Sequence, residues 1–547
     1  MTYESPVSSP WPLAEVDESA VKRLAQEAGV SEILARLLWR RGITDATEAR
    51  HWLHPTIDHL HPPELLPDFH LAVARLRQAL AGQEPILLWG HDDLDGVTAT
   101  AVLYRILSDL QAKVRYHIPE KGKERHGLTA GSVLSQDGVR LVVTVDCGVT
   151  NRQAVEVLKR RGVDVVVTDH HEVIEPLPEA VANVDPKRPD SRYPYRGLAG
   201  VGVALKLGMG LVQELLGISP REFLTVQPDA TALAVLGTIA DRVPLTGENR
   251  TLVVIGLRAL EQSRLPALRA VLETLNPENS QLTIQRFVAD LLPLFAAANG
   301  NEGVRHFLNA ELDEARSWVS QLAAKSREWR ADAERTFELA QEVLRKGDGI
   351  LFAQSKEFSL RALGSTAARL KERYQVPAVV MGWRGDAWVG ECRGTDSVNM
   401  LELLRAHRHY FLDYGGHKRA CGFSIADDKV EEFILKAERF AHENFVGRLL
   451  PERPPEADAF LPISRFSSDL LRLAPFGEGN PQPMLVSGPN TFLPSGSGWV
   501  CDERPDLILQ SADRKLEPGV PAWALWTFDD LGRLTILDFR PAPKNRP

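Results

Sequence analysis

Two hydrophobic patterns alternate through the first half of the chain. Short apolar runs, such as Ile86–Trp89 and Leu141–Val145, have the length and composition of buried strands. Longer segments between them carry apolar residues at helical spacing, as in Val97–Ser108 and Gly202–Leu216. Strands and helices that alternate in this way are typical of a parallel α/β sheet. We therefore predict a mostly parallel, doubly wound sheet within residues 81–285.

The rest of the chain shows four other patterns. Residues 1–80 contain short amphipathic segments broken by prolines, which indicates a helical preface. Glu311–Leu344 is polar with helical periodicity and predicts a long helix within a connector at 286–345. Residues 346–450 again mix strands with helices, which favours a smaller α/β domain. Residues 451–547 begin with a proline-rich linker and continue as short β-like stretches, which indicates a small β-barrel.

Composition limits the classes of function. With 547 residues the chain is too long for one core. A net charge of −9 gives no overall attraction to nucleic acid, so such a partner needs local basic patches or metal. The four cysteines form no CxxC pair, which argues against a disulfide framework and favours a reducing cytoplasm. No apolar run reaches the roughly 18–20 residues of a membrane span.

Carboxylate and imidazole side chains follow several apolar runs at the point where each strand should end. The carboxyl ends of parallel strands are where open α/β sheets bind ligands. Many carboxylates gathered there would repel one another, and two divalent cations would relieve the repulsion. Imidazole beside carboxylate favours Mn²⁺ over Mg²⁺ or Ca²⁺. The residues that follow the four runs are His91, Asp93, Asp95, Asp146, Asp169, His170, His171 and Asp241.

Each cluster also has a purely structural alternative. Asp95 and Asp146 are each a candidate cap for a following helix. The paired histidines could form an ordinary loop pair, and Asp241 could bond Arg242 or Arg250. The occurrence of four such clusters at expected strand ends favours a metal centre over four separate structural roles.

Taken in order, these segments resemble the motifs of the DHH phosphoesterase superfamily, and within it the RecJ-type single-strand nucleases. Nearly the whole chain takes part in the resemblance. Tyr414–His417 is similar to the GGH motif of the associated small domain, and Leu473–Pro481 to the entry of an OB-fold. The segments that resemble the DHH motifs are Gly90–Gly96, Val145–Val149, Thr168–His171, the glycine-rich Leu198–Ala204 and Thr238–Asp241.

The resemblance implies a role for each candidate residue. Asp146 would lie between two metal ions, Asp95 and His171 would support the ligands, and His417 would contact the phosphate or the leaving oxygen. Basic residues would hold the strand, although plain solvated surface is the alternative for each. The implied metal ligands are His91, Asp93, Asp146, His170 and Asp241, and the implied strand contacts are Lys121, Arg393, Lys418 and Arg419.

The fold and activity implied by the resemblance are those of a metal-dependent exonuclease. A DHH domain, a DHHA1-like domain and an OB-fold barrel would trim single-stranded DNA from 5′ to 3′ in repair or recombination, with Mn²⁺ or Mg²⁺. RNA is a further substrate candidate, and a single-strand-binding protein or helicase is a candidate partner. In the barrel, bases could stack on aromatic side chains, with core packing as the alternative for at least half. Those aromatic residues are Trp499, Trp523, Trp526 and Phe528.

Departures from the family pattern leave rival functions open. Residues 293–300 replace a stretch that in the family carries two arginines and an asparagine, and many bacterial members have Asp at the position of His91. One rival is a non-catalytic replication or repair scaffold of the same fold. The other is a phosphodiesterase for short oligonucleotides.

Overall fold

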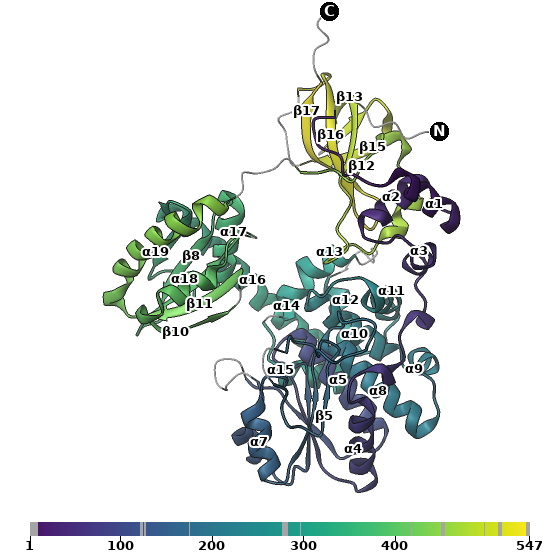
Figure 1. Cartoon of the computed structure of the whole chain (residues 1–547), viewed down its shortest axis with the longest axis vertical. Helices are drawn as coiled ribbons and strands as arrows, with labels where there is room; N and C mark the ends of the chain where they lie inside the picture. Colours follow the sequence, from purple (N-terminus) through teal and green to yellow (C-terminus); the bar gives the residue numbers. More distant parts are fainter. Residues whose placement is uncertain are drawn as a thin grey trace, which may run out of the picture. The chain divides into compact units, whose positions relative to one another are not determined.

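The computed structural model describes residues 9–120, 124, 127–173, 176–275, 283–295, 297–395, 397–416, 418–449, 455–496, 498–511 and 517–542. The chain forms two compact units, one of residues 1–322 and 455–547 and one of residues 323–454 (Figure 1). The boundary between them falls inside one long helix, α16 (Leu312–Glu342), where a helical connector is predicted. The finer division into five domains stays a prediction.

A five-stranded sheet lies at the centre of the first unit. Its strand order is β2-β1-β3-β4-β5, and all neighbouring strands run parallel. Strands β1 and β3 are buried along their whole length, because helices cover both faces of such a sheet, and this explains their unbroken apolar sequences. The predicted parallel α/β sheet is confirmed. The strands are β1 (Ile86–Trp89), β2 (Val114–His117), β3 (Leu141–Val145), β4 (Asp164–Thr168) and β5 (Ala182–Val184).

Three helices of this unit pack against one another beside the sheet. They are α5 (Leu94–Asp109), α8 (Gly200–Leu216) and α10 (Pro228–Ala240). Helix α5 begins three residues before the predicted start at Val97, because Asp93 accepts a hydrogen bond from Gly96 N and caps the first turn. Further helices of this unit are α4 (Phe69–Ala81), α6 (Ala130–Leu134), α7 (Arg152–Arg160), α9 (Pro220–Val226), α11 (Gly247–Glu261), α12 (Pro266–Leu275), α13 (Ile284–Arg286), the π-helix η3 (Phe287–Leu291), α14 (Leu292–Phe295) and α15 (Gly300–Asn309). Within the described ranges no single helix meets the length and apolarity needed to cross a membrane, and only the bent pair of α8 and α9 does so by length and composition.

The C-terminal strands of the first unit form the predicted barrel. The order β12-β13-β14-β15-β17-β16 is closed by a pairing of β13 with β16. Helices α1 (Glu18–Ala28), α2 (Glu32–Arg40) and α3 (Ala46–Leu53) share one apolar core with it. All four aromatic residues considered for base stacking are buried: Trp499, Trp526 and Phe528 lie in this shared core, whereas Trp523 packs in a separate apolar cluster with Trp11. The strands are β12 (Ala459–Phe460), β13 (Leu485–Ser495), β14 (Gly498–Cys501), β15 (Arg504–Ser511), β16 (Pro521–Phe528) and β17 (Leu534–Pro541).

The second unit is built on one mixed sheet. Its order is β10-β11-β9-β8-β7-β6, with a parallel pairing between β7 and β8 and antiparallel pairings elsewhere. The strands are β6 (Arg345–Gly347), β7 (Ile350–Ser355), β8 (Ala378–Trp383), β9 (Trp388–Arg393), β10 (Phe411–Gly416) and β11 (Ala420–Ile425). The helices that accompany them are α17 (Leu363–Tyr374), α18 (Met400–Ala406) and α19 (Val430–Asn444).

Candidate metal centre

The predicted ligands meet at the carboxyl edge of the parallel sheet. His91 follows β1, Asp146 follows β3 and His170 follows β4, while Asp241 lies just beyond the end of α10. Because parallel strands end at one edge, residues far apart in sequence come together there. The cluster is built around His170, whose Nε2 lies 3.1 Å from Asp146 Oδ1, 3.5 Å from Asp241 Oδ2 and 3.9 Å from Asp95 Oδ2.

The turn between β1 and α5 presents two of the ligands. His91 Nδ1 lies 2.7 Å from Asp93 Oδ2 and 3.6 Å from Asp146 Oδ2. The turn is tight, since a Cβ on Gly96 would lie 2.5 Å from the carbonyl oxygen of His91. Glycine is therefore required there for the loop to fold back and direct both side chains into the cluster.

Asp95 does not cap α5, in contrast to the structural alternative for that residue. Its side chain is buried and accepts hydrogen bonds from Gly200 N at 2.7 Å and Val201 N at 2.8 Å. These are unpaired donors of the first turn of α8, and the positive end of a helix dipole favours a carboxylate at that position. Asp95 thus joins the start of α8 to the turn between β1 and α5.

Asp146 occupies the most constrained position of the cluster. Its backbone is left-handed, with φ of 60°, and its side chain is only 2% exposed. Gly200 packs directly against it, because a Cβ there would lie 2.4 Å from Asp146 Oδ1. That oxygen has no hydrogen-bond partner among the described residues, and neither ring nitrogen of His170 has one. A helix-cap role for Asp146 is excluded, since Asn151 precedes α7.

The second histidine of the pair is held by a buried carboxylate. Asp169 Oδ1 lies 2.7 Å from His171 Nδ1, and Asp169 also accepts hydrogen bonds from the backbone N–H groups of Val149 and His170. His171 itself is about half exposed. Fixing Nδ1 in this way determines the orientation of the ring and leaves Nε2 for another contact.

The pKa values reflect how strongly the carboxylates repel one another. Burial, followed by the charge of neighbouring aspartates, raises the pKa of Asp95 and Asp146 well above the usual range. Burial and then the charge of Asp93 raise the pKa of Asp241 to about 6. Burial also acts on Asp93, but hydrogen bonding and attraction from His91 outweigh it and lower its pKa to about 2. Burial, followed by repulsion from a neighbouring histidine, lowers the pKa of His170 to about 4.

This donor set fits divalent metal ions. Three groups have ligand atoms that all lie within 4.8 Å of one another: Asp146 with His170 and His171, His91 with Asp93 and Asp146, and Asp95 with His170 and Asp241. The buried atoms without hydrogen-bond partners are those that a cation would satisfy. Neutral imidazole and ionised carboxylate are the forms that bind metal, and the low pKa of His170 favours the neutral ring.

Sequence reasoning missed a further acidic residue at this edge. Asp185 directly follows β5 and is fully buried. One oxygen accepts a hydrogen bond from Lys187 N at 2.7 Å, and the other has no partner in the described part of the chain. Burial, with a smaller contribution from the charge of Asp169, raises the pKa of Asp185 to about 7. The strand-end rule that found the other clusters applies here too, but a three-residue strand gives little signal.

The predicted strand contacts are partly described. Arg393 ends β9, where its guanidinium donates to Glu391 Oε2 at 2.9 Å. Lys418 and Arg419 are exposed in the connection between β10 and β11, next to Arg393 in the sheet register. His417 and Lys121 lie outside the described residues.

Comparison with known proteins gives consistent similarities. Residues 85–238 match the model of the DHH family N-terminal domain, and residues 347–443 match that of the DHHA1 domain. The single-stranded-DNA-specific exonuclease RecJ of Dickeya dadantii is 31% identical over 485 residues, which are 82% of each chain. The RecJ of Bacillus subtilis is 29% identical over 493 residues, and the match spans 87% of this chain but only 61% of that protein. The crystal structure of RecJ in complex with Mn²⁺ from Thermus thermophilus has 25% identity and a TM-score of 0.80, with coverage of 98% of this chain and 80% of that one.

Proposed function

The chain belongs to the RecJ family of single-stranded-DNA-specific exonucleases, and from this premise we propose that it hydrolyses single-stranded DNA at a two-metal centre. The observation that carries the proposal is the convergence of three ligand groups, linked to one another by Asp146 and His170, at one sheet edge. The metal ligands are His91, Asp93, Asp146, His170 and Asp241. Divalent ions bound there, with Mn²⁺ preferred to Mg²⁺, supply Lewis-acid stabilisation of phosphate charge and a more acidic water.

The protein's own groups position the reacting phosphate. The Asp169 carboxylate holds His171 so that its Nε2 can donate to a phosphate oxygen or to the leaving oxygen. Asp95 acts as a positioning residue, because it joins the first metal-binding turn to the start of α8. The first turn of α8 contributes a positive dipole end beside the site. Closely packed helices around the sheet edge keep these groups in fixed geometry.

The second unit and the barrel would hold the strand. In this proposal Arg393, Lys418 and Arg419 contact phosphates, together with His417 and Lys121 from outside the described residues. In this proposal the chain is divided into five domains: a helical preface at 1–80, the DHH domain at 81–285, a connector at 286–345, a DHHA1-like domain at 346–450 and an OB-fold at 451–547. We further propose that the protein releases nucleotides from the 5′ end. It would act in DNA repair or recombination, in the cytoplasm. A single-strand-binding protein or a helicase is the expected partner.

A nuclease assay tests the proposal directly. Oligonucleotides labelled at the 5′ or 3′ end, single- or double-stranded, of DNA or RNA, and a dinucleotide are incubated with Mn²⁺, Mg²⁺ or EDTA. We expect Mn²⁺-dependent release of nucleotides from the 5′ end of single-stranded DNA, and its loss in Asp146→Ala but not in Asp428→Ala, an exposed aspartate of the second unit. Metal-loaded protein that cleaves none of these would indicate a scaffold, and strong preference for the dinucleotide would indicate a short-oligonucleotide phosphodiesterase.

A further inference from the structure

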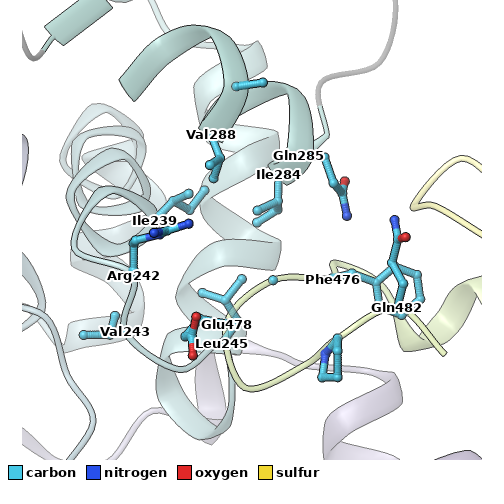
Figure 2. Close-up of a pocket in the computed structure, with 13 residues that line it drawn as sticks. Ile239, Arg242, Val243, Leu245, Ile284, Gln285, Val288, Phe476, Glu478 and Gln482 are labelled. Carbon is cyan, nitrogen blue, oxygen red and sulfur yellow. The ribbon is translucent and has the colours of Figure 1, made fainter. Parts of the chain in front are cut away.

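A cavity of about 470 Å³ lies within the first unit. Its walls come from the end of α10 and the residues after it, from α13 and η3, and from the loop 476–482 (Figure 2). Ile239 and Arg242, which line it, flank the metal ligand Asp241 in sequence. The cavity is therefore formed in part by the same chain segment that carries this ligand.

The lining combines apolar side chains with a few polar groups. Apolar side chains such as Ile284 and Val288 form one side. Gln285 and Gln482 reach into the space from different segments, and their amides point toward each other in Figure 2. Apolar faces with convergent amides suit a planar heterocycle that carries hydrogen-bond donors and acceptors on its edge.

One of these amides, that of Gln285, has a hydrogen-bond acceptor without a donor among the described residues. Gln285 hydrogen-bonds the carboxyl of Asp530, and its Oε1 is buried with no partner among the described residues. A buried carbonyl oxygen without a donor costs on the order of 1–3 kcal/mol, which a ligand N–H would recover. Each of the four nucleobases offers such a donor on its Watson–Crick edge.

The opposite wall is rigid before any ligand binds. Leu245 N donates to the Glu478 carbonyl at 2.7 Å, which joins the loop 476–482 to the segment after α10. Asn480 is fully buried, and its amide donates to the carbonyl oxygens of Leu473 and Pro475. A preformed cavity loses little entropy when it is filled, so it is suited to binding one repeating unit of a polymer.

The charged side chains of the lining determine which part of a nucleotide the cavity would bind. The Glu478 carboxylate lines the cavity and repels a phosphate, while it would accept hydrogen bonds from a base. Arg242 is exposed at the rim, where its left-handed backbone, with φ of 57°, directs the chain away from α10. Its guanidinium is placed to bind the phosphate attached to the same nucleotide.

We propose that this cavity binds one nucleobase of the single strand, next to the phosphate held at the metals, with Gln285 and Gln482 on the base edge and Arg242 on the backbone. The inference rests on the proposed exonuclease function and adds a base-binding subsite to it. A paired base cannot present its edge to two amides, so the cavity also favours single strands over duplex.

Filling the cavity tests the proposal. Val288→Trp places an indole in it, and Val157→Trp makes the same substitution at an exposed position of α7 as a matched control. We expect Val288→Trp to raise KM for a long single strand roughly tenfold, the value of one base contact, with little change in kcat.

An abasic site moved along the strand gives a readout that a merely structural role would not produce. The wild-type protein should bind more weakly when the abasic site occupies one fixed position from the end, and Val288→Trp should lose this dependence. The same strands with 2-aminopurine at each position, bound in EDTA, report occupancy of the cavity without cleavage. Uniform response to position in both measurements would overturn the inference even if the nuclease is active, whereas absence of cleavage alone would count against the proposed function only.

Discussion

Replacing Asp146 by asparagine should change stability in opposite directions with and without metal. In the metal-free protein its buried carboxylate has an oxygen within 4.8 Å of one on Asp93. At an effective dielectric constant of about 20, two such charges repel by roughly 3 kcal/mol. Attraction to His91, whose Nδ1 lies 3.6 Å away, offsets part of this repulsion. We therefore expect Asp146→Asn to raise the free energy of unfolding by about 1–2 kcal/mol at pH 8 in EDTA.

Bound metal should make the wild-type protein more stable than Asp146→Asn, the reverse of the order expected in EDTA. At a Mn²⁺ concentration of about 100 times Kd, the wild-type protein gains about 2.7 kcal/mol, because the ion binds the folded state. Asp146→Asn should gain much less, since the amide is a weaker ligand at the position shared by two ligand groups.

Urea unfolding in EDTA and in Mn²⁺ provides the assay, with Asp428→Asn as the control at an exposed aspartate. The control should match the wild-type protein in both conditions. The reasoning is refuted if Asp146→Asn is less stable than the wild-type protein in EDTA, or if it gains as much stability from Mn²⁺.

Three further predictions concern neighbouring groups. Asp169→Asn should weaken Mn²⁺ binding or lower kcat about 10–100-fold, because His171 loses its anchor, and titration calorimetry with a nuclease assay would show it. Lys206→Met should cost about 3–5 kcal/mol in urea unfolding by leaving the buried Glu248 carboxylate without its cation, and the double variant with Glu248→Leu should recover much of it. Asp185 has a folded pKa of about 7 against about 3.9 unfolded, so its ionisation destabilises the metal-free fold increasingly as pH rises toward 7. Asp185→Asn should therefore gain stability over the wild-type protein between pH 5 and pH 8, and an equal difference at both pH values would contradict this.

The strand-end pattern predicts the clustering of His91, Asp146 and His170 because each of them follows a different apolar strand, whereas Asp241 follows the helix α10 and not a strand as predicted. Once β1, β3 and β4 are parallel neighbours, His91, Asp146 and His170 must lie at one edge of the sheet. Nothing further is needed to bring them together. The same logic fails for Asp185, since β5 has only three residues and its sequence does not stand out.

Contacts between distant segments could not be predicted from local pattern. The partner of Asp95 is the backbone of Gly200, 105 residues away, and a local reading makes the same aspartate a helix cap. The base-binding cavity is likewise formed by Gln285 and Gln482, whose sequences carry no motif. The barrel aromatics leave a choice open at the level of sequence, because an aromatic residue in a strand serves either a core or a binding face. The fold confirms the core-packing alternative, since all four side chains are buried.

The most direct test of the account is the position of manganese in crystals of the protein soaked in MnCl₂. We predict two peaks of anomalous scattering at the sheet edge, both in contact with Asp146, one near His91 and Asp93 and the other near His170 and Asp241. An absence of manganese at this edge, or its binding only elsewhere on the protein, would contradict the claim that these side chains form a metal centre.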